Sequence, residues 1–323
     1  MQWTYLDNNA TTQPAPQVVD AMDEMLRDVW ANPSSVHRLG QMARQRVELA
    51  RASVARLIGC RERELIFTSG GTESNNLATF GVLSHAARPL LITTRIEHSA
   101  VRAPAEALDE SGATVVYLPT DDGGRVSPND LAAALKQYAH DCDVTLVSVH
   151  WANNETGVLE PIDELVEVVR AHRESAASNG WRATVLMHTD ATQAVGKLPV
   201  DVKDVGVDMM TFSGHKFHGP KGVGALYVRR GVRLRPTNRG GPQETDRRGG
   251  TENTPGIVGL GVAADLASAV VRDASAIDAC RARRDRFEKA MLEAVPDAVI
   301  NGASSPRLWN TSNIGFPRLE AEA

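Results

Sequence analysis

Seven short apolar runs, rich in β-branched residues, alternate along this chain with stretches of helical periodicity. The runs are 64-ELIFT, 90-LLITT, 114-TVVYL, 144-VTLVSV, 184-TVLMH, 207-VDMMTF and 223-VGALYV. Helical periodicity is clear in 43-ARQRVELARASVARLIG, where Gly59 fits a helix end, and in 161-PIDELVEVVRAHRESA. Because strands that alternate with helices form βαβ units, we predict an α/β fold with a mostly parallel central sheet and helices on both faces.

The length of 323 residues exceeds what one hydrophobic core usually serves, so we expect more than one domain. Two helical stretches, 257-IVGLGVAADLASAVV and 281-RARRDRFEKAMLEAV, close the sequence, and 319-LEAEA resembles the start of another helix. The predicted parts are an N-terminal arm at residues 1–14, a large domain at 15–255 and a smaller, truncated C-terminal domain at 256–323.

Composition argues against several functional classes. The net charge is −5 and no block of lysine or arginine stands out, so direct nucleic-acid binding is not expected. No apolar run is long enough to span a bilayer, and the start MQWTYLDNNATT lacks the features of a secretory signal. The three cysteines, Cys60, Cys142 and Cys280, are scattered, which argues against a disulfide framework and favours a reducing cytoplasm.

Polar, chemically capable residues follow strand after strand. The segments directly after five of the predicted strands are TSGGTESNN, RIEHSA, HWANNETG, HTDATQ and SGHKFHG. In open α/β sheets the ligand crevice lies outside the carboxyl ends of the strands. These segments therefore predict one shared site instead of separate surface loops.

The turn at Ser69, Gly70, Gly71 and Thr72 lies between a predicted strand and a helical stretch. Its free backbone N–H groups, hydroxyls and helix N-terminus suit a phosphate. A tight turn with a threonine N-cap explains the same residues, and no GK[ST] follows as in a nucleotide P-loop. Taken alone, this turn leaves both interpretations open.

Asp190 and Lys216 lie at the ends of two predicted strands. A carboxylate at Asp190 can keep a heterocyclic nitrogen protonated, although a helix N-cap explains it equally well. A dehydrated lysine favours its neutral, nucleophilic form, although a solvated turn lysine is the commoner case. An anion site, a carboxylate and an amine are what pyridoxal phosphate requires of a protein, so their combination favours that cofactor.

Three histidines lie near these segments. His98 can stack on a planar cofactor and move protons, or can be a hydrogen-bonded residue at a strand end. His215 and His218 are three residues apart, but no cysteine cluster or third carboxylate accompanies them at zinc-like spacing. We therefore predict no metal site.

Eight motifs follow one another from residue 5 to the region of residue 316. They are YLDNNATT, NPSSVHRLG, FTSGGTESNN, EHSAV, NNETG, HTDATQAVGK, SGHKFHGPKGVGALYVRR and GGPQETDRRGGTENTP. In order and spacing these motifs resemble the cysteine desulfurases of the class V aminotransferase family. The resemblance covers nearly the whole chain and implies a fold-type I transferase that depends on pyridoxal 5'-phosphate.

The resemblance implies a role for each matching residue. Lys216 corresponds to the Schiff-base lysine, Asp190 to the partner of the pyridine nitrogen, and His98 to a stacked residue that is a candidate acid–base. Gln193 and Asn154 are implied to contact the side of the ring that bears the phenolic oxygen. The implied phosphate ligands are Gly71, Thr72, Ser213 and His215, with Thr251 reaching the cofactor phosphate of the neighbouring subunit in a homodimer.

The same resemblance implies the reaction and the partners. L-Cysteine condenses with the cofactor, loses its α-proton and gives up its sulfur to an enzyme thiolate, which yields a persulfide and L-alanine. A sulfur-acceptor protein, such as an iron–sulfur cluster scaffold or a thiolation carrier, then takes the sulfur. The residues leave open which acceptor is used and whether selenocysteine, as in a selenocysteine lyase, is the better substrate.

The family carries its persulfide-forming cysteine on a C-terminal loop, beyond the last residue of this sequence, and no cysteine here matches that position. Cys60 resembles a buried small residue, and Cys142 lies between two aspartates that raise a thiol pKa. Cys280 has arginines nearby and is the best stand-in, although it matches no family motif. Three interpretations stay open: a truncated form of a normal desulfurase, half of a split enzyme, and a cofactor-binding assembly module. We favour the first, because the upstream catalytic positions are retained.

Overall fold

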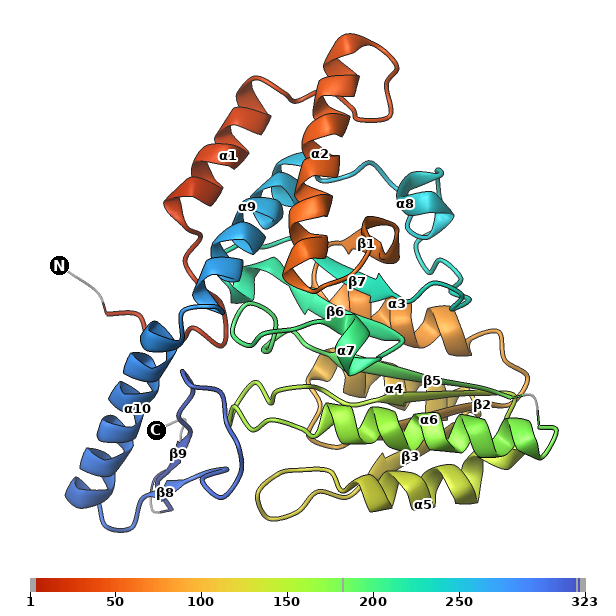
Figure 1. Cartoon of the computed structure of the whole chain (residues 1–323), viewed down its shortest axis with the longest axis vertical. Helices are drawn as coiled ribbons and strands as arrows, with labels where there is room; N and C mark the ends of the chain where they lie inside the picture. The colour runs from red at the N-terminus through yellow and green to blue at the C-terminus, as the bar shows by residue number, and fades with distance from the viewer. Residues whose placement is uncertain (1–3, 182, 318, 320–323) are drawn as a thin grey trace.

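The seven apolar runs form one sheet with the strand order β1-β7-β6-β5-β4-β2-β3 (Figure 1). The computed structural model describes residues 4–181, 183–317 and 319. The strands of the sheet are β1 (Leu65–Thr68), β2 (Pro89–Thr94), β3 (Thr114–Leu118), β4 (Val144–Ser148), β5 (Thr184–Asp190), β6 (Met209–Ser213) and β7 (Gly224–Val228), and a separate pair is β8 (Val299–Ile300) with β9 (Ile314–Gly315). The ends of each sheet strand agree with the predicted run to within two residues.

The sheet is mostly parallel, as predicted. Strands β3, β2, β4, β5 and β6 pair in parallel, and β7 is antiparallel to both of its neighbours, β6 and β1. Ser213 pairs with Gly224, so the turn that contains Lys216 joins β6 to β7. Because parallel strands end at the same edge, the ends of β4, β5 and β6 bring Ser148, Asp190 and Ser213 to one side of the molecule.

Helices cover both faces of the sheet (Figure 1). The helices are α1 (Pro16–Arg27), α2 (Arg38–Leu57), α3 (Gly71–Leu83), α4 (Ser99–Glu110), α5 (Pro128–Tyr138), α6 (Ile162–Ser178), α7 (Val202–Val205), α8 (Gln243–Asp246), α9 (Thr254–Val270) and α10 (Ala274–Ala294). Helices α3 and α4 pack together on one face, α5 and α6 on the other, and α1 and α2 pack against α9 beside β1 and β7. Gly59 follows α2 with φ of +71°, which fits the predicted helix end.

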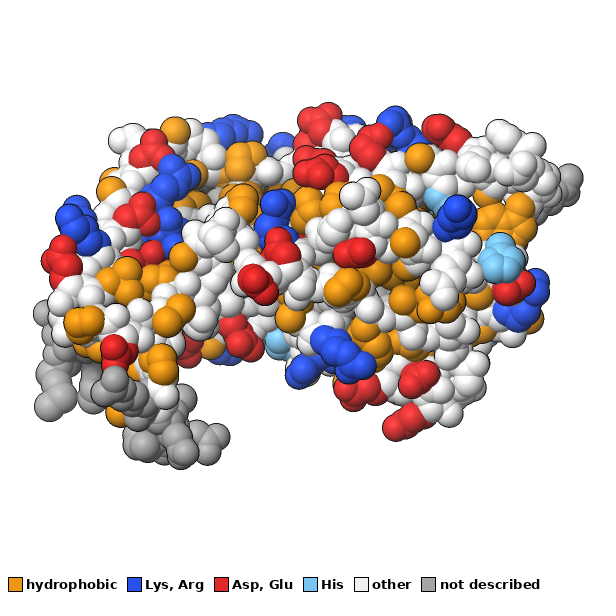
Figure 2. Space-filling view, turned by 90° about the horizontal axis from the view of Figure 1, so that it is seen from below, with side chains coloured by type: hydrophobic (Ala, Val, Ile, Leu, Met, Phe, Trp, Pro, Cys, Tyr) orange, Lys and Arg blue, Asp and Glu red, His pale blue; other side chains and the backbone are white. Residues whose placement is uncertain are grey.

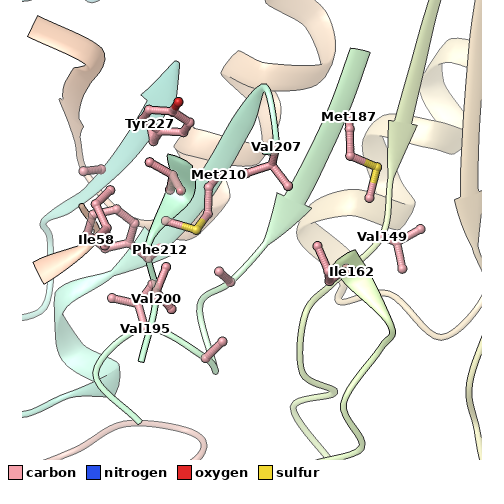
Figure 3. Packing of buried hydrophobic residues seen from close by; sticks show 14 of the residues in the cluster. Ile58, Val149, Ile162, Met187, Val195, Val200, Val207, Met210, Phe212 and Tyr227 are labelled. Carbon is pink, nitrogen blue, oxygen red and sulfur yellow. The ribbon is translucent and has the colours of Figure 1, made fainter. Parts of the chain in front are cut away.

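Side chains of the strands alternate between two apolar clusters, one on each face of the sheet. In β2, Leu91 belongs to the cluster under α3 and α4, whereas Leu90 and Ile92 belong to the larger cluster under α5 and α6. Phe212 of β6 is fully buried in the larger cluster, which also contains Val195 and Val200 (Figure 3). This burial on both faces explains why the strands appear in the sequence as nearly continuous apolar runs.

The C-terminal part of the described chain forms a lobe beside the sheet (Figure 1). Buried residues of α9 belong to the large core cluster, whereas α10 bends away from α9 by 83° and lies next to β8 and β9. Within this lobe Arg307 pairs with Glu288 through two hydrogen bonds of 2.8 Å. The domain division near residue 256 stays a prediction, and the predicted helix start at 319–323 lies, except for Leu319, outside the described residues.

Hydrophobic and charged side chains are interspersed on the face shown in Figure 2, including the lobe at its left. Phe287 and Leu292 of α10 are 53% and 40% exposed. No single helix within the described ranges is long and apolar enough to cross a membrane. Helices α9 and α10 pass that test only as a pair with the 83° bend between them.

The described part of the N-terminal arm, residues 4–14, lies against the turn that carries Lys216. The Thr12 N–H donates to the His215 carbonyl oxygen at 2.8 Å, and Thr12 Oγ1 accepts from the His218 N–H at 2.7 Å. These bonds hold the arm, including Asn9, at the carboxyl edge of the sheet.

Truncating Phe212 tests the importance of the larger cluster. Phe212→Ala should lower the free energy of unfolding by about 3–5 kcal/mol, because it removes a fully buried aromatic side chain and leaves a cavity. The half-exposed Phe287 provides a matched control, and Phe287→Ala should change that free energy by less than about 1 kcal/mol. Urea unfolding monitored by circular dichroism measures both, and equal losses would contradict this description of the core.

Candidate active site

Residues from the ends of β1, β2, β4, β5 and β6 line one cavity of about 1100 Å³ at the carboxyl edge of the sheet. All but one of the site residues predicted from the sequence line it, namely Gly71, Thr72, His98, Asn154, Asp190, Gln193, Ser213, His215 and Lys216. The exception, Thr251, lies at a separate pocket of about 120 Å³ together with Ser69 and Glu244. The shared cavity agrees with the prediction of one site, and the roles of these residues stay predictions.

The turn that carries Lys216 depends on its glycines. Residues Gly214–Lys216 form a single 3-10 turn between β6 and β7. A Cβ at Gly219 would lie 2.7 Å from the carbonyl oxygen of Gly214, which is closer than real Cβ contacts allow. The absence of side chains lets the two backbone segments pack against each other, and this close packing fixes the position of the lysine.

The amine of Lys216 is partly dehydrated. It donates hydrogen bonds to the carbonyl oxygens of Asn9 and Ala10, at 2.6 and 2.8 Å. Burial lowers its pKa, and the carboxylates of Asp190 and Asp7 offset only part of that effect. A lowered pKa increases the neutral, nucleophilic fraction of the amine at neutral pH.

Asp190 is the last residue of β5 and is 6% exposed. Its Oδ2 accepts a hydrogen bond from Asn75 Nδ2 at 2.6 Å, and its Oδ1 accepts from the Thr192 N–H at 2.9 Å. These two donors fix the orientation of the carboxylate at the cavity wall. A carboxylate held in this way suits a protonated heterocyclic nitrogen.

The N-terminus of α3 forms a cup for an anion. Gly70, just before the helix, has φ of +151°, and a Cβ at Gly71 would lie 3.1 Å from Thr192 Oγ1. That hydroxyl oxygen is buried and has no hydrogen-bond partner within the described part of the chain. Ser213, 2% exposed, also lines the cavity. Free helix N–H groups, two hydroxyls and close backbone approach together suit a phosphate.

Two predicted histidines have defined hydrogen bonds. His98 is the N-cap of α4, and its Nδ1 accepts from the Ala100 N–H at 3.1 Å, which leaves Nε2 available in the cavity. His215 Nδ1 lies 3.1 Å from Thr11 Oγ1, and burial, followed by the charge of Lys216, lowers the pKa of His215 to about 4. In the described ranges no three histidine, cysteine or carboxylate side chains form a group that could hold a metal ion.

Comparison with known proteins identifies the family. Residues 4–323 match the family described as aminotransferase class-V, and the chain is 45% identical to cysteine desulfurase 2 of Trichormus variabilis over 326 residues. The chain belongs to the aminotransferase class-V family. This alignment covers 100% of the present class-V chain and 77% of the Trichormus protein.

Two solved structures support the same relationship. A NifS-like protein has a TM-score of 0.89 and 34% identity to this class-V chain, over 99% of the chain and 84% of that protein. SspA in complex with cysteine has a TM-score of 0.83 and 34% identity, over 97% and 84%. The predicted fold type is therefore confirmed, and the cofactor of this class-V enzyme is pyridoxal phosphate.

The residues of the cavity fit this cofactor. The unpartnered hydroxyl of Thr192 and the glycine-lined helix end match a phosphate, and Asp190 matches the ring nitrogen. Lys216 supplies an amine in the same cavity with a lowered pKa. The three requirements recognised in the sequence thus occur together in one class-V site.

Asn9 was missed by the sequence analysis, although it belongs to the quoted motif YLDNNATT. Its carbonyl oxygen accepts hydrogen bonds from Lys216 Nζ at 2.6 Å and from Gln193 Nε2 at 2.9 Å. Its side-chain Nδ2 donates to the Asn154 carbonyl oxygen at 3.2 Å and to Thr311 Oγ1 at 3.1 Å. A polar residue in an arm carries no periodic signal, so only its family motif could have indicated this position.

A buried histidine between two glutamates was also missed. His150 Nδ1 lies 3.0 Å from Glu97 Oε1, and His150 Nε2 lies 3.7 Å from Glu160 Oε1. Burial alone would lower the pKa of His150, but the two carboxylates dominate and raise it to about 9. Since His150 lines the cavity and Glu97 precedes His98, the cluster anchors the loop that carries His98.

The three cysteines have different surroundings. Burial first, and then Glu64, raises the pKa of Cys60 to about 12, and burial followed by Asp141 raises the pKa of Cys142. The direction for Cys142 agrees with the sequence analysis, which gave no pKa direction for Cys60, a partly exposed residue. Cys280 lies on α10 and lines the main cavity, a position that the sequence did not reveal.

Alkylation should distinguish these thiols. At pH 7.5 iodoacetamide should modify Cys280 first, because burial raises the pKa of Cys60 and Cys142 and so suppresses their thiolate forms. Peptide mass spectrometry over a time course measures the order, and Cys280→Ser should remove the fastest phase. Earlier modification of Cys142 would contradict the assignment of buried, inert thiols.

The His150 cluster predicts a pH dependence of stability. Because folding raises the pKa of His150 from 6.5 to about 9, its contribution is fully present below about pH 6.5 and is lost as pH rises through 9. The cofactor-free wild type should therefore lose stability between these values, and His150→Gln should flatten the dependence. His140→Gln, at an exposed site, serves as the control. Parallel urea-unfolding profiles for the wild type and His150→Gln would refute the cluster's role.

Proposed function

We propose that this protein is a cysteine desulfurase, which converts L-cysteine to L-alanine and passes the sulfur on as a persulfide. The observation that carries the proposal is the joint presence of Lys216, Asp190 and the α3 anion cup in one cavity. The Trichormus relative is named as a cysteine desulfurase, and the similar SspA structure contains cysteine. Both names support L-cysteine as the substrate.

We assign the cofactor-holding residues as follows. Asp190 pairs with the ring nitrogen, and Gln193 and Asn154 face the phenolic oxygen. Lys216 carries the amine that bonds to the cofactor aldehyde, and His98 stacks on the ring. The phosphate ligands are Gly71, Thr72, Ser213 and His215, with Thr251 contributing to the phosphate site of a second subunit.

The bound cofactor supplies an aldehyde that condenses with amines and a ring that delocalises negative charge from the substrate α-carbon. Asp190 favours this delocalisation because its fixed carboxylate stabilises a positive charge on the ring nitrogen. Lys216, with its lowered pKa, takes up and returns the α-proton as a general base and acid. His98 Nε2 is positioned to deliver or remove a proton on the substrate side of the cavity.

The sulfur leaves by attack of an accepting thiolate on the substrate sulfur. The C–S bond breaks, a persulfide forms on the acceptor, and protonation of the remaining carbon skeleton gives alanine. The raised pKa of Cys60 and Cys142 makes both poor acceptors. Cys280 lines the cavity, but its surroundings match no motif of the family, so we assign the accepting thiol to none of the three.

We further propose a cytoplasmic homodimer that delivers sulfur to an acceptor protein, such as an iron–sulfur scaffold or a thiolation carrier. The position of Thr251 supports the dimer, because this residue lies outside the main cavity of its own subunit and is available to the main cavity of a second subunit. Exposed apolar side chains on and between α1 and α2 supply a surface for the contact, namely Val19, Leu26, Trp30, Val36, Leu39, Met42 and Leu49. We retain the division into a large part at 15–255 and a smaller part at 256–323.

Replacing Lys216 tests the proposal. Lys216→Ala should abolish the visible absorbance of the bound cofactor and lower alanine release from L-cysteine by at least about 1000-fold, because the variant lacks the nucleophilic amine. Lys136→Ala, at a surface helix site, is the matched control and should behave like the wild type.

The substrate and the assay outcomes separate the alternatives. Faster alanine release from selenocysteine than from cysteine would indicate a selenocysteine lyase. A yellow wild-type protein that releases no alanine would indicate a cofactor-binding module or half of a split enzyme. Visible absorbance that persists in Lys216→Ala would contradict the assignment of the lysine.

A further inference from the structure

A second lysine, Lys197, lies in the same cavity as Lys216 and has no role in the reaction described above. It follows β5 and is 5% exposed. Its Nζ donates to Gln193 Oε1 at 2.5 Å and lies 3.4 Å from Asn9 Oδ1. A buried ammonium that faces two amide oxygens is costly to dehydrate, so its position calls for an explanation.

The ammonium group of lysine has three donors and no acceptor. Gln193 must therefore direct its oxygen, and not its NH₂ group, toward Lys197. The amide nitrogen then faces the other way, where Nε2 donates to the carbonyl oxygen of Asn9 at 2.9 Å. Lys197 thus selects one of the two orientations of the Gln193 amide, whose oxygen and nitrogen ends have nearly the same shape.

Lys197 orients Asn9 by the same argument. Asn9 Oδ1 is directed toward the ammonium, and its Nδ2 donates instead to the Asn154 carbonyl oxygen and to Thr311 Oγ1. Since the Asn9 carbonyl oxygen accepts from both Gln193 Nε2 and Lys216 Nζ, these two donors lie close to each other. One ammonium group therefore fixes a network that ends beside the reactive amine.

Pyridoxal phosphate carries its phenolic oxygen on the ring carbon next to the aldehyde. When the aldehyde of the cofactor bonds to Lys216, the phenolic oxygen therefore lies close to the side chains that surround this lysine. A hydrogen-bond donor is required there, and Gln193 Nε2 is one only in the orientation that Lys197 enforces. The reversed amide would direct a carbonyl oxygen at the phenolic oxygen and repel it.

We propose that Lys197 is a positioning residue that holds the Gln193 amide with its N–H donor facing the cofactor's phenolic oxygen. This inference rests on the proposed assignment of Lys216 to the cofactor aldehyde. It adds a charged group, four residues after Gln193 in the sequence, to the residues that determine cofactor affinity and absorbance.

The charge of Lys197 sets the pH range of this role. Burial, and then the charge of Lys216, lowers the pKa of Lys197 to about 7. The ammonium form of Lys197, which only donates and on which the orientation of the Gln193 amide depends, therefore predominates below about pH 7.

The test replaces the ammonium with an apolar group of similar length. Lys197→Met should shift the visible absorption maximum of the bound cofactor and weaken pyridoxal phosphate binding roughly tenfold, the effect of losing about one oriented hydrogen bond. Lys197→Arg keeps a cation that only donates and should restore most of the wild-type spectrum. Lys203→Met, at an exposed lysine, is the matched control and should change neither property.

A double-mutant cycle shows whether Lys197 acts through Gln193. In a Gln193→Ala background, Lys197→Met should cause no further spectral shift. An equal shift in both backgrounds would overturn the inference, as would a wild-type spectrum and affinity in Lys197→Met. If the methionine variant does not fold, Lys197→Gln, which can donate and accept, should show a smaller shift in the same direction, and an unchanged spectrum would again overturn the inference.

The wild-type protein and Lys216→Ala are measured in parallel. Visible absorbance in the wild type that disappears in Lys216→Ala keeps the proposed function intact, so an unchanged Lys197→Met then rejects the positioning role alone. Wild-type protein that binds pyridoxal phosphate without visible absorbance would overturn both.

Discussion

The carboxylate of Asp190, held at the carboxyl end of β5, is the fixed point on which the site depends. Its backbone oxygen accepts from the Trp151 N–H at 2.9 Å, and its side chain accepts from Asn75 and the Thr192 N–H. The register of β5 with β6 places Asp190 opposite Thr211, two residues before β6 ends at Ser213. The sheet therefore determines the separation between the carboxylate and the turn that carries the reactive lysine.

Electrostatics in the cavity follow from this arrangement. Two lysines, Lys197 and Lys216, share a partly dehydrated space, and Asp190 and Asp7 offset only part of the effect of burial on Lys216. Both amines consequently have lowered pKa values. A site of this kind prefers a ligand that brings its own negative charge, as a phosphate ester does, and the cup at the start of α3 provides the matching donors.

Much of the fold could be predicted because burial on both faces gives each strand an uninterrupted apolar run, as in Leu90 to Ile92. Lys216 and Asp190 could be recognised because polar groups at successive strand ends must share one sheet edge. Asn9 and Lys197 could not, because Asn9 lies in an arm without periodicity and the contact between the two residues joins positions far apart in sequence. For His150, the sequence showed the residue after a strand but not the two carboxylates that raise its pKa.

The most direct measurement of the central claim is the position of covalent attachment. Sodium borohydride reduces the bond between a lysine amine and the cofactor, and peptide mass spectrometry then locates the pyridoxyl group. We predict that this group is found on Lys216 in the purified wild-type protein. A pyridoxyl group on Lys197 or on any other lysine, with Lys216 unmodified, would contradict it.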